Sequence, residues 1–162
     1  IANDGVRVTP NVIAGFIDSS GKYTKSKPQS TTRVVSASTA QQMRLMMESV
    51  VSEQGTAPAA AIPGYRVAGK TGTAQRADST CHCYRGYTAS FIGFAPADAP
   101  KYVVSVVIQN PQGMHWGGVL GGPVFKEVMS FVLQSKHIPP TAARKDAYAL
   151  TEASIKVAKK SA

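Results

Sequence analysis

The sequence has few acidic residues, no long apolar stretch and only two cysteines. Its 162 residues include 9 Asp and Glu against 18 Lys and Arg, which gives a formal net charge of +9. No run of about 18 apolar residues occurs, so no segment is expected to span a membrane. The basic residues are scattered and do not cluster with aromatic residues, which argues against a nucleic-acid partner. A basic surface of this kind suits work beside anionic polymers, such as a cell wall or a membrane surface.

The sequence also lacks an N-terminal methionine and a recognisable signal peptide. It opens on IANDG, which is typical of the end of a helix followed by a turn, so we expect the chain to begin inside a larger protein. A hydrophobic content of 43% suits one domain with its own core. We assign residues 1–138 to that domain. Residues 139–162 are rich in Ala and Lys with little apolar spacing, and we expect a basic, mobile tail there.

The two cysteines, Cys81 and Cys83, enclose His82, and His115 is a further potential zinc ligand. Zinc sites normally separate paired cysteines by about two to four residues, so a single intervening residue argues against a metal. A disulfide between them would close a very tight ring but is possible in an oxidising compartment. We therefore expect loop cysteines, free or disulfide-linked, and predict no metal and no cofactor.

The segment GYRVAGKTGTAQ, residues 64–75, fits two different motifs. Residues 64–71 match the phosphate-loop pattern G-x-x-x-x-G-K-[ST], and residues 70–72 match the K-T-G motif of penicillin-interacting serine enzymes. A phosphate loop needs a buried strand before its first glycine and a helix that starts at its lysine. The preceding residues, TAPAAAIP, contain two prolines, and the following ones show no helical apolar spacing. The sequence therefore favours an extended strand over a nucleotide site.

Upstream of this segment we predict a hairpin and a helix. Apolar and polar residues alternate over 6–35 around a turn at DSSGK, which predicts a small β-rich excursion or hairpin. A helix is predicted over 36–55. Ser38 and Gln41 would form its capping box, and Gly55 would end it in a left-handed conformation. Its apolar residues follow helical spacing and are expected to pack in the core: Met43, Met46, Met47, Val50 and Val51.

Downstream we predict two further strands and a second helix. A polar loop over 76–85 follows the K-T-G strand, and the short turn PADAP then joins strands at 86–96 and 101–110 into an antiparallel hairpin. The helix covers 121–135, with Pro123 in its first turn. Its apolar face is predicted to consist of Val124, Val128, Phe131 and Val132. This order of elements predicts an α+β fold, an antiparallel sheet with helices packed on its faces.

The K-T-G strand places polar groups in a pattern that suits an anionic ligand. Side chains alternate between the faces of a strand, so Thr71 and Thr73 should point the same way with only Gly72 between them. Two hydroxyls on one face, beside a glycine that lets another backbone approach, suit a carboxylate. Lys70 begins on the opposite face, but its long side chain could reach around the strand edge. On three residues alone, a surface strand with uninvolved threonines remains the alternative.

The surroundings of the motif carry a more specific resemblance. From Ile1 to about Pro140 the sequence resembles the class B penicillin-binding proteins, the monofunctional D,D-transpeptidases of peptidoglycan synthesis, and most closely the division-type members. The matching segments occur in order: IANDG, VSASTAQQMRLMMESVV, GTAPAAAIPGY, YRVAGKTGTAQ and GYTASFIGFAPADAPKYVVSVVIQNP. The resemblance implies a fold like that of penicillin-binding proteins and serine β-lactamases, and a location on the outer face of the bacterial cytoplasmic membrane.

The resemblance also implies roles for the motif residues. Lys70 would stand beside the catalytic serine and assist proton transfer. Thr71, Gly72 and Thr73 would hold the terminal carboxylate of a D-Ala-D-Ala stem peptide or of a β-lactam. The backbone N–H of Thr73 would be one of two donors of the oxyanion hole. We therefore predict Lys70 and Thr73 as catalytic residues and Thr71, Gly72 and Thr73 as substrate-binding residues.

Two motifs of the family are absent. The only S-x-x-K runs from Ser19 to Lys22, in a glycine-containing turn that would not hold a helical i, i+3 pair, and no S-x-N occurs. We expect the serine nucleophile, its base and the membrane anchor upstream, in a partner segment of the same protein. This chain alone is predicted to be inactive and to expose apolar surface. A β-lactam-sensing or β-lactamase-type domain is the alternative, which hydrolytic turnover of penicillin would favour over a stable acyl-enzyme.

Overall fold

The computed structural model describes residues 1–27 and 30–141. The chain divides into two compact units, Ile1–Gln41 and Gln42–Ala162. Nearly all of the predicted tail, residues 139–162, therefore lies outside the described residues.

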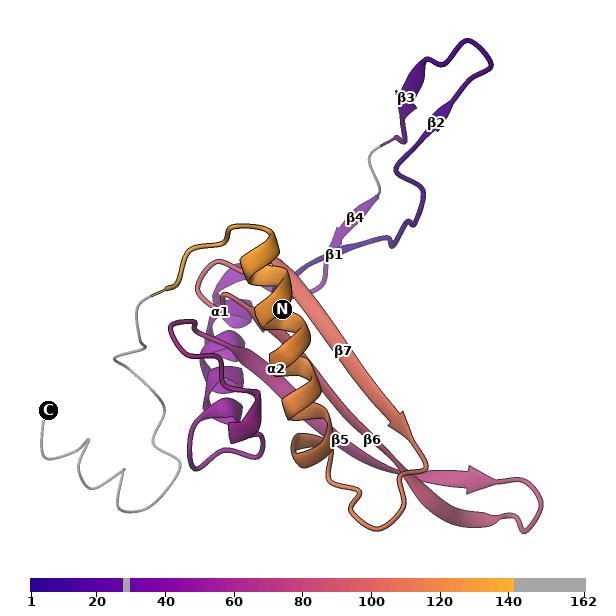
Figure 1. Ribbon diagram of the computed structural model, residues 1–162, viewed down its shortest axis with the longest axis vertical. Helices are drawn as coiled ribbons and strands as arrows, with labels where there is room; N and C mark the ends of the chain where they lie inside the picture. The colour runs from indigo at the N-terminus through magenta and orange to yellow at the C-terminus, as the bar shows by residue number, and fades with distance from the viewer. Residues whose placement is uncertain (28–29, 142–162) are drawn as a thin grey trace, which may run out of the picture. The chain divides into compact units, whose positions relative to one another are not determined.

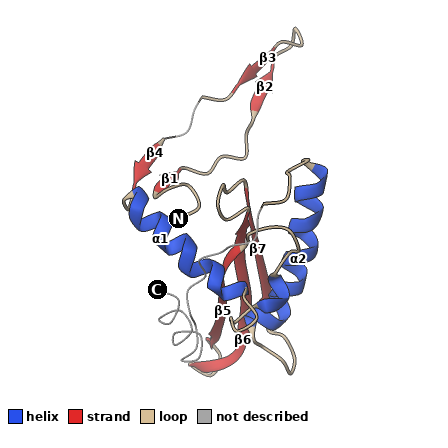
Figure 2. Cartoon of the chain, turned by 90° about the vertical axis from the view of Figure 1, so that its left-hand side faces the viewer, coloured by secondary structure: helices blue, strands red, loops and turns tan. Residues whose placement is uncertain are grey.

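The first unit contains two short antiparallel strand pairs. β1 (Val6–Val8) pairs with β4 (Thr31–Arg33), and β2 (Gly15–Ile17) pairs with β3 (Tyr23–Lys25). Figures 1 and 2 show both pairs, with β2 and β3 inserted between β1 and β4 along the chain. The β-rich excursion predicted over 6–35 is confirmed.

The turn between β2 and β3 is organised by the carboxylate of Asp18. Its Oδ1 accepts hydrogen bonds from the Ser20 hydroxyl at 2.6 Å, the Ser20 N–H at 2.9 Å and the Lys22 N–H at 3.0 Å. The Ser20 hydroxyl, followed by the Lys22 amide, lowers the pKa of Asp18 below its ordinary value. The S-x-x-K match from Ser19 to Lys22 thus lies in a turn and not on a helix.

α1 (Ala37–Glu48) begins earlier than the predicted capping box requires. The hydroxyl of Ser36 accepts the Thr39 N–H at 3.1 Å, so Ser36 is the capping residue. The prediction of a box between Ser38 and Gln41 is wrong. Residues 36–39 contain three hydroxyl side chains, and the sequence alone does not distinguish which of them caps the helix.

The C-terminal end of this helix also differs from the prediction. α1 tightens into a 3₁₀ turn, η1 (Ser49–Val51), and Gly55 does not take the left-handed conformation. Gly55 is needed for close approach instead, because a Cβ there would meet the carbonyl oxygens of Ser49 and Val50. The buried carboxylate of Glu48 binds the Arg66 guanidinium through Nε at 3.0 Å and Nη2 at 2.7 Å, which ties the end of α1 to the chain before β5.

The methionine stripe is only partly a core feature. The side chains of Met43 and Met46 are 42% and 50% exposed, so the prediction that they are core residues is wrong. Val50 and Val51, at the end of the same stripe, do pack against the buried cluster. The periodicity therefore marks an apolar face correctly, but only its last turn reaches the core of the second unit.

The second unit is built on a three-stranded antiparallel sheet. β5 (Ala68–Asp78), β6 (Cys83–Ala95) and β7 (Tyr102–Gln109) lie in the order β5-β6-β7, which confirms the predicted antiparallel hairpin. Lys70 is paired with Ile92 inside β5, so no helix begins there and a phosphate loop is excluded.

The polar loop predicted over 76–85 is mostly strand. β5 and β6 continue into it and leave a turn over 79–82, with Cys81 and Cys83 joined in a disulfide. The register shifts between Gln75 and Ala77, which marks a β-bulge. Polar side chains suit a hairpin arm exposed on both faces as well as they suit a loop, which is why composition alone misplaced the boundary.

α2 (Gly117–Ser135) packs on one face of the sheet, as Figures 1 and 2 show, and its position corrects two predictions. The helix starts before residue 121, so Pro123 lies inside it and not in its first turn. Its buried large residues are Phe125, Met129 and Leu133, while the predicted members Val124, Val128 and Phe131 are exposed by 45%, 43% and 71%.

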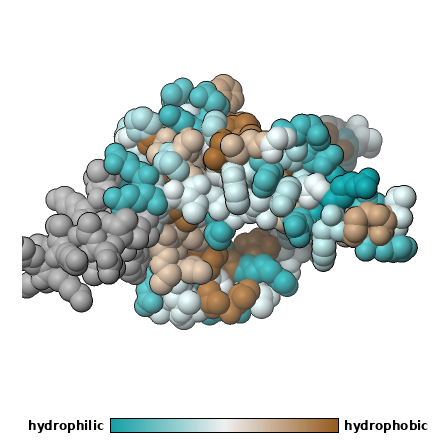
Figure 3. All heavy atoms as spheres, turned by 90° about the horizontal axis from the view of Figure 1, so that it is seen from below, coloured by the Kyte–Doolittle hydropathy of each residue, from teal (hydrophilic) through white to brown (hydrophobic). Residues whose placement is uncertain are grey.

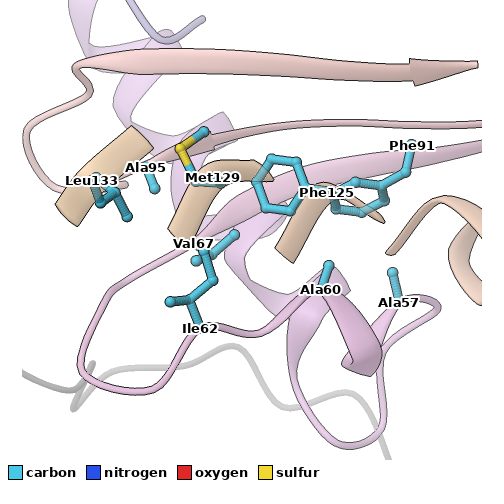
Figure 4. Packing of buried hydrophobic residues seen from close by; sticks show 9 residues of the cluster. All are labelled: Ala57, Ala60, Ile62, Val67, Phe91, Ala95, Phe125, Met129 and Leu133. Carbon is cyan, nitrogen blue, oxygen red and sulfur yellow. The ribbon is translucent and has the colours of Figure 1, made fainter. Parts of the chain in front are cut away.

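The core lies between α2, the sheet and the connector before β5. Phe91 from β6 and Phe125 from α2 meet edge to face, with ring centroids 4.9 Å apart. Figure 4 shows how the remaining side chains surround this pair: Ala57, Ala60, Ile62, Val67, Ala95, Met129 and Leu133. The apolar residues of α2 occupy one wide arc of the helix, so their spacing alone does not determine which part of that arc is buried.

The opposite face of the sheet leaves apolar residues exposed. Along β7, Val104 and Val106 pack against the core, while Val103 and Val107 are 61% and 52% exposed. Ile92 on β6 is 46% exposed. Brown, apolar residues lie beside teal ones on the molecular face drawn in Figure 3. The expected exposure of apolar surface is confirmed for the described residues.

Two phenylalanines of α2 test which face is structural. Phe125→Ala should lower the free energy of unfolding by about 3–5 kcal/mol, because it removes a fully buried ring and leaves a cavity. Phe131→Ala on the same helix should change it by less than about 0.5 kcal/mol, because that ring is exposed. Urea unfolding of the two variants measures both values. Equal losses would contradict this assignment of the faces.

Candidate functional site

A pocket of about 450 Å³ opens at the middle of β5. It lies where β5, the segment after η1 and the start of α2 meet. Its lining residues are Thr56, Lys70, Thr71, Thr73, Trp116, Gly117, Gly118 and Val119. Three of the four residues predicted from the K-T-G motif therefore line one pocket, and Gly72 lies between two of them in the strand.

The two threonine hydroxyls are already engaged by neighbouring elements. The Gly117 N–H, in the first turn of α2, donates to Thr73 Oγ1 at 3.2 Å. Thr71 Oγ1 lies 3.3 Å from Thr56 Oγ1. Because Thr73 Oγ1 accepts from the helix, its own hydroxyl hydrogen is left to be donated to a ligand. The hydroxyls of Thr56, Thr71 and Thr73 at the pocket therefore form a polar site that suits an anionic hydrogen-bond acceptor.

Lys70 lines the same pocket with its ammonium turned back on the strand. Nζ donates to the backbone carbonyl oxygen of Thr71 at 2.8 Å, and the side chain is exposed. A lysine that begins on the opposite face of a strand can thus still present its charge beside the threonines. The ammonium adds a positive charge to the hydroxyl cluster.

Glycines make the close approach of α2 to the sheet possible. A Cβ on Gly117 would meet the carbonyl oxygens of Gly72 and Ser90, and a Cβ on Gly72 would meet Ser90 Oγ. A Cβ on Gly118 would meet the carbonyl oxygen of Thr56. The backbone of α2 thus approaches the carbonyl oxygen of Gly72 closely, in agreement with the expectation that another backbone approaches there, and it is Gly117 that makes this approach possible.

Thr56, Trp116 and Gly117 also line the pocket but were not predicted from the sequence. Thr56 precedes a proline-rich connector, and no local pattern marks it as a ligand-binding residue. Trp116 belongs to an aromatic group. His115 stacks on Tyr87 with ring centroids 4.0 Å apart, and the ring centroids of Trp116 and His115 are 5.0 Å apart. The Trp-Gly-Gly at 116–118 was a signal that could have been used, because paired glycines at a helix start allow close backbone contact.

The described residues give no support to the metal alternative. Cys81 and Cys83 are bonded to each other, and His115 is stacked on Tyr87. No group of three or more potential metal-ligating side chains occurs within residues 1–27 and 30–141. Over the same residues, no helix has the length and apolar character needed to cross a membrane.

Comparison with known proteins places the chain in a family. The family model described as "Penicillin binding protein transpeptidase domain" matches residues 1–130. The chain belongs to this family of transpeptidase domains. The recognition made from the sequence, a class B penicillin-binding protein of the division type, is confirmed, and so is the α+β fold of that family.

Individual relatives agree with this assignment. Penicillin-binding protein PbpB of Mycolicibacterium smegmatis is 42% identical over 149 residues, which cover 86% of this chain and 23% of that protein. The "probable peptidoglycan D,D-transpeptidase PenA" of Neisseria flavescens is 44% identical over 110 residues, or 67% of this chain and 28% of that protein. Penicillin binding protein 3 of Mycobacterium tuberculosis in complex with ampicillin superposes with a TM-score of 0.83 at 37% identity, over 92% of this chain and 35% of that chain. The chain thus spans about a quarter of the two curated relatives.

Alanine substitutions at two glycines of α2 distinguish the effect of close backbone contact on stability from the effect of helix propensity. Gly117→Ala should lower the free energy of unfolding by about 1–3 kcal/mol, because its Cβ would meet two backbone oxygens that cannot move cheaply. Gly122→Ala is the control. Its Cβ would lie 3.3 Å from the nearest atom, the Ala60 nitrogen, and alanine favours a helix by up to about 1 kcal/mol. Urea unfolding should show a clear loss for the first variant and a smaller change for the second, because the tight contact with the Ala60 nitrogen offsets the gain in helix propensity.

Proposed function

We propose that this chain forms part of the active site of a penicillin-binding D,D-transpeptidase, which cross-links peptidoglycan stem peptides through a serine acyl-enzyme. The observation that carries the proposal is the pocket at the middle of β5, where Thr71, Thr73 and Lys70 converge. The chain's family, together with a relative named as a D,D-transpeptidase and another solved with ampicillin, supports this choice of chemistry.

In this proposal the pocket receives the C-terminal carboxylate of a D-Ala-D-Ala donor, or the carboxylate of a β-lactam. The hydroxyls of Thr71 and Thr73 donate to it, and Lys70 supplies positive charge and assists proton transfer. The N–H of Thr73 stabilises the oxyanion of the tetrahedral intermediate; one such donor typically contributes on the order of 10²–10³ in kcat. Serine attack releases D-Ala, and an amine of a neighbouring stem then takes the acyl group.

β5 is suited to hold such a donor in extended form. In the described part of the chain β5 pairs only with β6, so its other edge is open. An extended peptide can add to an open strand edge through main-chain hydrogen bonds, while side-chain pockets give specificity. The motif residues would then act on a substrate aligned with their own strand.

No S-x-N occurs in this sequence and its S-x-x-K match, Ser19 to Lys22, lies in a turn, so the serine nucleophile and its lysine base would come from another segment of the same transpeptidase. The exposed apolar residues on the outer face of the sheet, Ile92, Val103 and Val107, offer a surface that such a segment would cover. This chain alone would be inactive. The assembled protein would work at the outer face of the cytoplasmic membrane, without a cofactor.

Labelling with a fluorescent penicillin tests the proposal. The chain, combined with the preceding segment of the domain, should form a stable covalent adduct on that segment and none on this chain, because the attacking serine lies elsewhere. Label on this chain would contradict the division of roles. Rapid hydrolysis of the penicillin would favour the alternative, a β-lactamase-type domain.

Substitutions in β5 test the carboxylate cradle in the same assembly. Thr71→Val and Thr73→Val should each slow acylation by penicillin about 10- to 100-fold, because each removes a hydrogen bond to a charged group. Thr73→Ser should retain most of the rate. Thr88→Val is the matched control on β6, where the hydroxyl donates to the Gln109 side chain at 2.8 Å and lies outside the pocket lining. Unchanged rates in both β5 valine variants would remove these hydroxyls from the mechanism.

A further inference from the structure

A second, strongly polar pocket lies further along β5, at the bulge. β5 and β6 pair at Gln75 with Tyr87 and again at Ala77 with Tyr84, so two residues of β6, Arg85 and Gly86, oppose the single residue Arg76 of β5, and β6 is the bulged strand. A bulge bends its strand and redirects side chains. The pocket here has a volume of about 300 Å³, and its lining residues are Arg76, Ala77, Asp78, Ser79, Arg85 and Asn110.

The backbone at this place is specialised for the bulge. Gly86 has a φ of +72°, and a Cβ there would meet Oδ1 of Asn110. The N–H of Asn110 in turn donates to the Tyr87 carbonyl oxygen at 2.9 Å, which holds the end of β7 against the bulge. The two arginines therefore project from a defined irregularity of the sheet and not from a featureless surface.

The pocket has an excess of positive charge. Two guanidinium groups face one carboxylate, that of Asp78, whose Oδ2 lies 3.9 Å from Arg85 Nε. That contact is long, and the Arg85 side chain is 76% exposed, so the pair leaves most donor capacity of Arg85 unused. Among the described residues, Arg76 makes no ion pair. Planar guanidinium groups of this kind bind carboxylates in a bidentate manner.

The distance between the Arg76–Arg85 pocket and the threonines indicates which part of a donor peptide could reach the arginines. Arg76 follows Thr73 by three residues in the same strand, a distance of about 10 Å at the usual rise of a strand, and its side chain starts on the opposite face of β5; an added strand also presents its side chains to both faces in turn. In the proposed function the donor's terminal carboxylate is held at Thr71 and Thr73, and its reacting carbonyl faces the Thr73 N–H. The residues before that carbonyl, in a peptide extended along β5, would then continue toward Arg76.

We propose that Arg76 and Arg85 form a second carboxylate subsite, which binds an acidic side chain of the donor peptide about three residues before the scissile bond. The inference rests on the proposed function, because that function sets the direction of the donor. The Thr71–Thr73 cradle recognises the end of the donor, and the arginine subsite recognises its body. A β-lactam, which is too short to extend this far, engages only the first.

Donor pairs that differ in one charge test the subsite. The assembled transpeptidase is given two synthetic peptides ending in D-Ala-D-Ala, with Glu or Gln at the third residue before the scissile bond. The Glu donor should acylate about five- to ten-fold faster, since exposed ion pairs each contribute modestly and two guanidinium groups act together. Raising the salt concentration from about 0.05 to 0.5 M should reduce this preference.

Charge-neutral variants assign the preference to the two arginines. The double variant Arg76→Gln with Arg85→Gln should abolish the Glu preference, while its acylation by penicillin should stay within about two-fold of the parent. Lys101→Gln, an exposed lysine before β7, is the matched control and should keep the preference. Asp78→Asn should increase it, because it removes the competing carboxylate while its amide oxygen can still accept the Thr80 N–H now bound at 2.8 Å.

The outcomes separate this inference from the proposed function. Normal penicillin acylation without a Glu preference, or a preference that survives the double arginine variant, overturns the subsite and leaves the proposed function standing. Failure of the assembled protein to acylate with any donor or with penicillin overturns both. Loss of penicillin acylation in the double variant, with the fold intact by circular dichroism, would place the arginines in the reaction itself and overturn the subsite as described.

Discussion

The arrangement of the site depends on one contact that has no room for a side chain. The first turn of α2 lies against the middle of β5 and β6 so closely that any Cβ at Gly117 would meet the carbonyl oxygens of Gly72 and Ser90. This contact brings the Gly117 N–H to the Thr73 hydroxyl and places Trp116 at the rim of the pocket. The helix thereby orients a strand side chain directly, without an intervening side chain that could change rotamer.

The same contact decides which face of α2 is buried. Gly117, Gly121, Phe125, Met129 and Leu133 follow one another at intervals of four residues and form one buried stripe, which drifts slowly around the helix from the site into the core. The glycines at the start of this stripe identify the buried side of α2 better than its apolar residues do, because the apolar residues cover a wider arc of the helix than the stripe. Packing and site geometry are specified by the same first turn.

Local pattern predicted the elements well and their faces and ends less well. The K-T-G segment was predicted to be a strand because its surroundings do not fit a phosphate loop. The β6–β7 hairpin and the excursion over 6–35 were predicted from turn residues and from the alternation of apolar and polar residues. The cap of α1, the start of α2 and its buried side did not, because each depends on which of several equivalent residues meets a partner distant in sequence. For the candidate site, the motif gave Lys70, Thr71 and Thr73. Thr56 could not be found, since its hydroxyl is brought to Thr71 only by the tertiary fold.

The open edge of β5 has a consequence for the behaviour of the protein in solution. An unpaired strand edge is a template for a second copy of the same chain as well as for a short peptide, and long flat edges promote association of that kind. Here β5 carries the cations of Lys70 and Arg76, and its pairing with β6 bends at the bulge opposite Arg76. These features limit the length over which another protein strand could stay in register. The edge therefore favours transient binding of a peptide of a few residues over stable association with a strand of another protein.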